Sequence, residues 1–118
     1  MKRGIIVDDA TVMRMRLRDI LSTRYEIVGE AENGQRALEL YAQLKPDFVT
    51  MDITMAEMNG MEALKNLTTR YPEARVVMVS AMGQKALVFE ALNQGARDFI
   101  IKPFDPERVV KAINRLFE

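Results

Sequence analysis

Five polar side chains stand where short apolar runs end. Asp8 and Asp9 follow the first run, Asp52 follows a second, Ser80 ends a third, and Lys102 follows a fourth. Carboxylates are hard oxygen ligands that suit Mg²⁺, whereas an ammonium and a hydroxyl bind phosphoryl oxygens. If the fold brings these groups together, they predict a site for magnesium-dependent phosphoryl chemistry.

The apolar runs that precede these residues are short and rich in β-branched side chains, which is typical of strands buried on both faces of a parallel sheet. They cover residues 4–7, 47–51, 76–79 and 98–101. A more polar strand is predicted over 25–31, where the alternation of Glu26, Val28 and Glu30 favours an edge of the sheet. In an open parallel sheet the ligand site lies beyond the carboxyl ends of the strands. We therefore expect the five polar side chains to converge there.

A helical pattern follows each predicted strand. The apolar stripes predict helices over residues 10–21, 37–44, 61–71 and 84–93, and a last helix capped by Asp105 with Pro106 in its first turn. Five βα units with right-handed crossovers predict an α/β fold with helices on both faces of the sheet, a three-layer sandwich.

Composition limits the classes of function. The chain has 118 residues, the size of one domain, with 17 basic and 17 acidic residues and no basic run, which argues against nucleic acid as a partner. It has no cysteine and no histidine, which excludes disulfides, thiolate chemistry and the commonest general base. No stretch is long enough for a signal peptide or a membrane span, so we expect a cytoplasmic protein without a membrane partner.

Each polar residue also has an ordinary structural interpretation. Asp8 and Asp9 could cap a helix, Asp52 could lie in a turn, Ser80 could be a helix cap, and Lys102 could simply precede the strand-stopping proline. Three carboxylates crowded together would repel one another, however, and a divalent cation resolves that conflict. Asp52, which ends a predicted central strand, is then a candidate nucleophile that forms an acyl phosphate.

The set Asp-Asp, Asp, Ser and Lys-Pro, in this order over five βα units, resembles the receiver domain of bacterial response regulators. The resemblance covers residues 1–118 as a single domain and is nearest to the single-domain receivers of chemotaxis. It implies a flavodoxin-like (βα)5 fold with strand order 2-1-3-4-5. It also implies a stand-alone response regulator, a switch rather than a turnover enzyme, that accepts a phosphoryl group from a histidine kinase.

The resemblance assigns a role to each matching position. Asp52 is the expected phosphoacceptor. Asp9 and Asp52 are expected to bind Mg²⁺ directly together with the backbone carbonyl of Thr54, and Asp8 is expected to act through a metal-bound water.

Other positions would hold and report the phosphoryl group. Lys102 and Ser80 are expected to contact its oxygens, with the backbone N–H groups of Thr54 and Ala81. A pull of Ser80 toward the phosphoryl group would vacate space for the aromatic switch residue, Phe99. The Lys102–Pro103 bond is a candidate for a cis peptide.

The resemblance also suggests partners. The candidates for a partner surface are Lys85, Val88, Phe99 and Ile101, with the alternative that Val88 and Ile101 belong to the core. The expected partners of a monomeric protein are the kinase, a downstream target such as a flagellar motor switch component, and a phosphatase.

Two positions depart from the family pattern. Ala56 replaces a proline in the loop after the phosphoacceptor, which should restrain that loop less. Phe99 stands where chemotaxis receivers commonly have tyrosine, so the ring has no hydroxyl to bond a partner.

Alternative functions remain open at this point. The chain could serve a phosphorelay other than chemotaxis or be a receiver cut from a longer regulator. Asp8-Asp9-Ala10-Thr11 faintly resembles the nucleophile loop of haloacid-dehalogenase phosphatases, but Ala10 stands where their second aspartate belongs. A nucleotide or flavin binder of the same fold would need a glycine-rich phosphate loop, which does not follow the first strand.

Overall fold

The computed structural model describes residues 1–55 and 58–118, in which strands and helices alternate from end to end. The expected departure at Ala56 lies outside the described residues. The five strands are β1 (Arg3–Val7), β2 (Glu26–Ala31), β3 (Phe48–Asp52), β4 (Val76–Ser80) and β5 (Asp98–Ile101). The five helices are α1 (Thr11–Leu21), α2 (Gly34–Leu44), α3 (Gly60–Arg70), α4 (Lys85–Asn93) and α5 (Pro106–Arg115).

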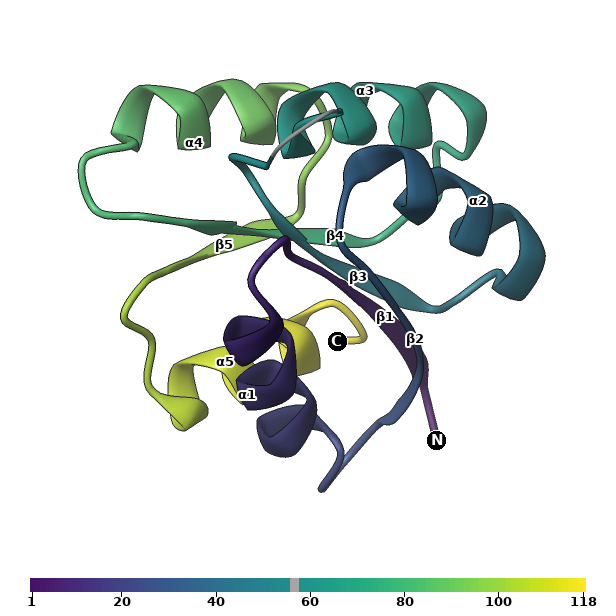
Figure 1. Ribbon diagram of the computed structural model, residues 1–118, viewed down its shortest axis with the longest axis vertical. Helices are drawn as coiled ribbons and strands as arrows, with labels where there is room; N and C mark the ends of the chain where they lie inside the picture. The colour runs from purple at the N-terminus through teal and green to yellow at the C-terminus, as the bar shows by residue number, and fades with distance from the viewer. Residues whose placement is uncertain (56–57) are drawn as a thin grey trace.

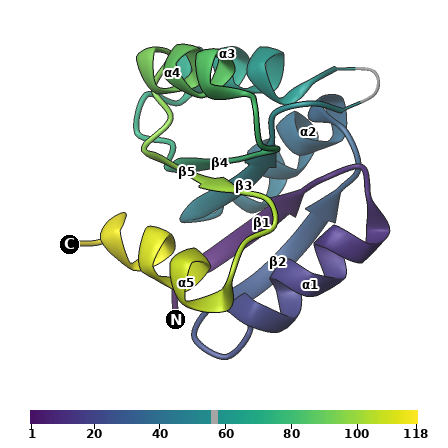
Figure 2. The same cartoon turned by 90° about the vertical axis from the view of Figure 1, so that its left-hand side faces the viewer.

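The strands form one parallel sheet in the order β2-β1-β3-β4-β5. Helices α1 and α5 cover one face, and α2, α3 and α4 cover the other (Figures 1 and 2). The predicted α/β three-layer sandwich and its 2-1-3-4-5 order are therefore confirmed, and β2 lies at the edge that its alternating pattern indicated. Because all strands run the same way, their carboxyl ends meet along one rim of the sheet.

The register aligns the ends of the strands that carry the polar residues. Val7 pairs with Met51, Asp52 with Val79, and Ser80 with Ile101. Asp8 and Asp52 therefore lie at the same level in the sheet, Ser80 lies one residue further along, and Lys102 two residues further.

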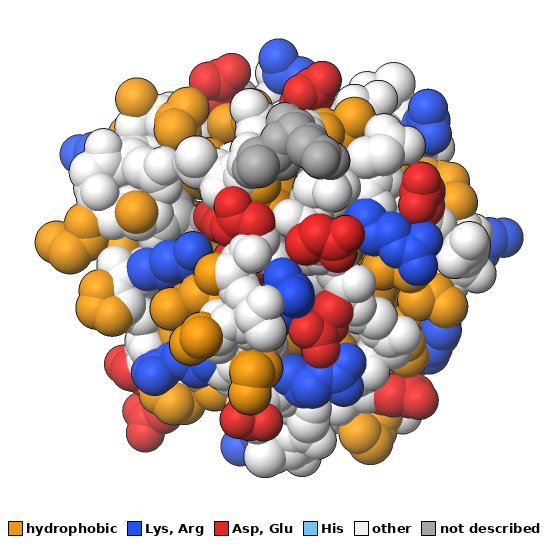
Figure 3. Space-filling view, in the orientation of Figure 1, with side chains coloured by type: hydrophobic (Ala, Val, Ile, Leu, Met, Phe, Trp, Pro, Cys, Tyr) orange, Lys and Arg blue, Asp and Glu red, His pale blue; other side chains and the backbone are white. Residues whose placement is uncertain are grey.

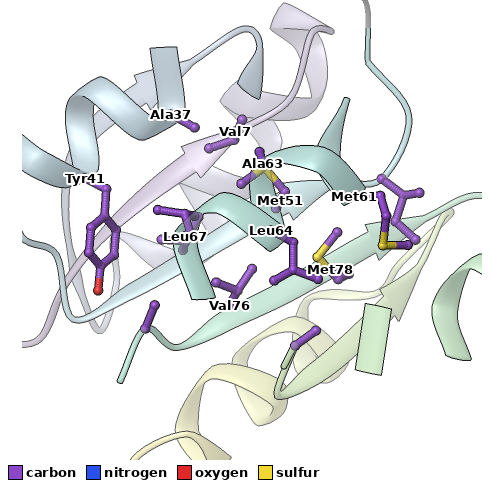
Figure 4. Packing of buried hydrophobic residues seen from close by; sticks show 14 of the residues in the cluster. Val7, Ala37, Tyr41, Met51, Met61, Ala63, Leu64, Leu67, Val76 and Met78 are labelled. Carbon is purple, nitrogen blue, oxygen red and sulfur yellow. The ribbon is translucent and has the colours of Figure 1, made fainter. Parts of the chain in front are cut away.

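Alternate residues of the strands enter two hydrophobic clusters, one on each face of the sheet. The cluster under α2, α3 and α4 contains Val7, Met51, Leu64, Leu67 and Met78, which Figure 4 shows in contact across the helix–sheet interface. The cluster under α1 and α5 contains Ile6, Leu17, Phe48, Ile100 and Ile113. All five residues of β3 and all five of β4 are buried, so the central strands form a rigid base for the rim.

Local signals explain where most helices begin and end. Asn33, Asn59 and Asp105 cap α2, α3 and α5 by accepting a hydrogen bond from a backbone N–H in the first turn. The expected helix over 84–93 begins one residue later, at Lys85, because Gln84 has non-helical backbone angles and is the N-cap. Its side chain makes no capping hydrogen bond, and its amide points elsewhere. Among the described residues no helix has the length and apolar character needed to cross a membrane.

The start of α3 is fixed by a close approach between Gly60 and the end of β3. The Gly60 N–H donates to the Ile53 carbonyl at 2.8 Å. A Cβ on Gly60 would lie 1.9 Å from the backbone oxygen of Asp52, closer than any real contact. Glycine is required here because only its bare Cα lets the helix reach the strand that carries Asp52.

Replacing Gly60 with alanine should therefore destabilise the protein. Alanine has the higher helix propensity, by about 1 kcal/mol, so propensity alone would raise the free energy of unfolding. We expect it instead to fall by roughly 2 kcal/mol, because the backbone must move to relieve the overlap. Urea denaturation followed by circular dichroism measures the change. Thr69→Ala, at an exposed position of the same helix, is the control; equal stability of Gly60→Ala and the parent would contradict the predicted overlap.

Candidate phosphoryl and metal site

The carboxylates of Asp8, Asp9 and Asp52 gather at the rim of the sheet. Each offers an oxygen within 4.8 Å of the others. Asp52 ends the central strand β3 and is 6% exposed, Asp8 is buried, and Asp9 is exposed. Two adjacent strands position the cluster, since the pair directly follows β1 and the third residue ends β3. Figure 3 shows acidic and basic side chains side by side near the middle of the face that it presents.

Lys102 lies between two of these carboxylates. Its Nζ is 3.3 Å from Asp8 Oδ2 and 3.5 Å from Asp52 Oδ2. The residue is placed by the end of β5, where its backbone N–H donates to the Ser80 carbonyl at 2.7 Å. The Lys102–Pro103 peptide is cis, as expected. The ammonium thus supplies one positive charge to a group of three carboxylates.

Burial and the neighbouring charges perturb the pKa of Asp52. The pKa of the Asp52 carboxyl is raised from 3.8 to about 6, first by burial and second by the neighbouring Asp8 carboxylate. The Lys102 ammonium and a hydrogen bond from the Thr54 backbone N–H act in the opposite direction and do not compensate fully. A cation bound beside this carboxyl would favour its ionised form.

Asp8 and Asp9 have different surroundings. The Oδ1 atom of Asp8 accepts a hydrogen bond from the Ala10 N–H at 2.8 Å, and its Oδ2 faces Lys102. Asp9, being exposed, approaches the cluster from solvent. Three hard oxygen donors, one of them open to water, fit the preference of Mg²⁺ for a few carboxylates and several waters.

Ser80 contributes an unsatisfied hydroxyl. It ends β4 and is 1% exposed, yet its Oγ has no hydrogen-bond partner among the described residues. Leaving a buried hydroxyl unpaired costs stability, so its retention indicates a binding role. A ligand oxygen at the rim would satisfy it.

Two backbone N–H groups flank the same region. The Thr54 N–H bonds the Asp52 carboxylate, whereas the Ala81 N–H donates to the side-chain oxygen of Gln84 at 2.7 Å. Gln84 also donates from Nε2 to Thr54 Oγ1 at 2.8 Å. Sequence reasoning missed this role of Gln84; its one signal was a polar residue directly before the first turn of a helix.

Arg14 is a second residue whose contact with this site was not predicted from the sequence. Its Nη1 donates to the backbone oxygen of Asp8 at 2.6 Å, and its Nε pairs with Glu30 at 3.2 Å. Arg14 therefore holds the turn that presents Asp8 and Asp9. Its position on the buried side of α1, one turn after the acidic pair, was the available signal.

A cavity of about 250 Å³ adjoins the site, between α4 and β5. Ser80, Gln84, Val88 and Phe99 line it, so it joins the buried hydroxyl to the aromatic ring of β5. Phe99 is half-buried and has free volume beside it, which suits a side chain that changes position.

The predicted partner surface needs one correction. Val88 is 5% exposed and packs into the core under α4, so it is not available to a partner in this state. Lys85 is exposed, and Ile101 is 46% exposed rather than part of the core. Phe89, 55% exposed with Lys85 Nζ 5.8 Å from its ring centre, belongs to this surface and was missed. Its signal was the apolar run at residues 87–89, which a single helix cannot bury entirely.

The raised pKa of Asp52 predicts how the metal-free protein responds to pH. Because the folded state binds this proton more tightly than the unfolded state, the contribution of Asp52 lowers stability as pH rises from about 4 to about 6. Asp52→Asn should therefore be more stable than the parent at pH 8, by about 1 to 3 kcal/mol. This difference in stability between Asp52→Asn and the parent should fade below pH 4, where the Asp52 carboxyl is protonated in both the folded and the unfolded state.

Urea denaturation in the presence of a chelator, at pH 4 and pH 8, measures this difference. Asp19→Asn, at an exposed position of α1, is the control and should show no comparable gain. A parent protein more stable than Asp52→Asn at pH 8 would contradict the charge imbalance described above.

Comparison with known proteins agrees with this geometry. The family description "Response regulator receiver domain" matches residues 5–114. The chain is 56% identical to the chemotaxis protein CheY of Thermotoga maritima, over 98% of this chain and 97% of the relative. It is 53% identical to CheY of Bacillus subtilis, over 96% and 95%.

Solved structures show the same fold. The CheX–CheY–BeF3–Mg²⁺ complex from Borrelia burgdorferi contains a chain that superimposes with a TM-score of 0.95 at 34% identity, covering 99% of this chain and 90% of that one. The response regulator domain of Thermotoga maritima CheB gives a TM-score of 0.87 at 37% identity, over 99% and 94%. Matched along nearly its whole length in both sequence and structure, the chain belongs to the response regulator receiver domain family.

Proposed function

We propose that the chain is a chemotaxis response regulator that accepts a phosphoryl group on Asp52 from a histidine kinase. The observation that carries the proposal is the position of Asp52, at the end of the central strand with two further carboxylates within 4.8 Å and the Lys102 ammonium at 3.5 Å. The near-complete matches to CheY proteins support the chemotaxis role.

The metal that this chemistry requires is Mg²⁺. Asp9 and Asp52 would hold it directly with the Thr54 carbonyl, and Asp8, already engaged by Ala10 and Lys102, would act through a bound water. The ion supplies positive charge that offsets the carboxylates and the phosphoryl oxygens. The cluster of three acidic residues and the BeF3–Mg²⁺ complex of the Borrelia burgdorferi relative support this assignment.

The protein groups then act by position and charge. An oxygen of Asp52 attacks the phosphorus of the phosphohistidine, an O–P bond forms, and the N–P bond to the kinase breaks. Lys102 and the buried Ser80 hydroxyl would contact two phosphoryl oxygens, with the N–H groups of Thr54 and Ala81. The unpaired Ser80 Oγ supports this role, since the phosphoryl group would satisfy it.

The phosphoryl group would be reported through the cavity. Ser80 would move toward the phosphoryl oxygen, and the Phe99 ring would turn inward into the cavity that both residues line. The readout surface would comprise Lys85, Phe89, Phe99 and Ile101, a face that changes shape when the ring turns. A shift of the active-to-inactive ratio from 1:99 to 99:1 needs about 5.5 kcal/mol of differential stabilisation. The phosphoryl group would supply it, and the bistable packing would turn a small local shift into a change of the surface.

The proposed partners follow from this scheme. They are the kinase, a downstream target such as a flagellar motor switch component, and a phosphatase. The CheX–CheY complex of the relative supports a further protein partner that engages the BeF3-bound form. We also propose that residues 1–118 form one receiver domain that acts as a monomer in the cytoplasm and does not turn over a substrate.

Incubation with acetyl phosphate and Mg²⁺ should add one phosphoryl group, measured by intact mass. The addition should vanish in Asp52→Asn, because the amide is not a nucleophile, and persist in Asp19→Asn. Sustained hydrolysis of a phosphomonoester, with no phosphoryl group added to the protein, would instead favour a phosphatase.

Magnesium affinity tests the ligand assignment separately. Asp9→Ala should bind Mg²⁺ at least tenfold more weakly by calorimetric titration, because it removes a direct ligand and one negative charge. Asp19→Ala removes a like charge from an exposed helix position and should bind as the parent does. Equal affinity in Asp9→Ala would show that the ion sits elsewhere.

A further inference from the structure

The side chain of Gln84 connects the two loops that flank Asp52. An N–H can only donate, so the Ala81 N–H fixes the Gln84 amide with its oxygen toward Ala81, at 2.7 Å. The amide nitrogen then points to Thr54 Oγ1, at 2.8 Å. The bridge joins the loop after β4 to the loop after β3.

We infer that the Gln84 carboxamide and the phosphoryl group compete for the Ala81 N–H. The phosphoryl group must displace the carboxamide before it can accept that hydrogen bond. The inference rests on the proposed function, in which that N–H binds a phosphoryl oxygen. Ala81 has one backbone hydrogen, and a strong bond to a phosphoryl oxygen leaves none for Gln84. The charge-assisted bond is the stronger of the two, so the exchange favours the phosphoryl group but at a cost.

Displacement of Gln84 would also reach the switch. Gln84 lines the same cavity as Ser80 and Phe99, and it is the residue from which α4 begins. When its amide leaves Ala81 and Thr54, the wall of the cavity and the first turn of α4 lose their link to the loop after β3. Gln84 therefore connects occupancy of the Ala81 N–H to the face that contains Phe99.

The test is Gln84→Ala, titrated with beryllofluoride in the presence of Mg²⁺ by calorimetry. Without a bridge to break, the variant should bind roughly two- to tenfold more tightly than the parent, the equivalent of about one net hydrogen bond. Gln94→Ala, at an exposed position after the same helix, is the matched control and should be unchanged. Equal or weaker binding by Gln84→Ala overturns the inference. Failure of every protein, the parent included, to bind beryllofluoride contradicts the proposed function instead.

Two further measurements separate the bridge from a general loosening of the loop. In the metal-free protein, amide hydrogen exchange at Ala81 should be slow in the parent and in Gln94→Ala but fast in Gln84→Ala, because Ala81 is otherwise exposed. Thr54→Val removes the acceptor of the second bond and should tighten beryllofluoride binding by less than Gln84→Ala does. Equal exchange rates at Ala81 in the parent, Gln94→Ala and Gln84→Ala would show that the bridge does not form.

Discussion

The repulsion among three carboxylates, which a single ammonium offsets only in part, is the constraint on which the site depends. Asp8 and Asp52 both face Lys102, yet burial and the Asp8 carboxylate still raise the pKa of Asp52 to about 6. Such a cluster is costly in a folded protein and survives only where surrounding packing holds it in place. Here the fully buried strands β3 and β4, together with the close approach of Gly60, provide that support.

The same constraint explains why the site residues have different roles. Asp8, buried and bonded to Ala10, is fixed, whereas Asp9 is open to solvent and free to adapt to an ion. The Ser80 hydroxyl, which has no hydrogen-bond partner within residues 1–55 and 58–118, lies beside a cavity that extends to Phe99. The reactive groups thus lie at the centre of the sheet, with the adaptable ligand beside them after β1 and the movable ring on the edge strand β5.

Much of this could be predicted from the sequence because it depends on period and position. Buried strands of a parallel sheet are continuous apolar runs, and the polar residue at the end of each run must lie at the rim. The sequence alone therefore predicts that Asp52, Ser80 and Lys102 lie there. The strand order came from resemblance, because crossover rules alone leave several orders open. The exposure of Ile101 and the burial of Val88 were left undecided, since both are apolar and only tertiary packing distinguishes them. The Gln84 bridge and the Arg14 bond to Asp8 depend on side-chain directions across loops, which no periodicity encodes.

Helix α4 buries only Val88 and Ala91 along its nine residues. Few side chains therefore attach α4 to the sheet, and core packing does not restrict the residue types at most of its outward positions. Substitutions of those outward side chains during evolution could therefore change which partner proteins bind α4, while the reactive pocket and the strands beneath it stay the same.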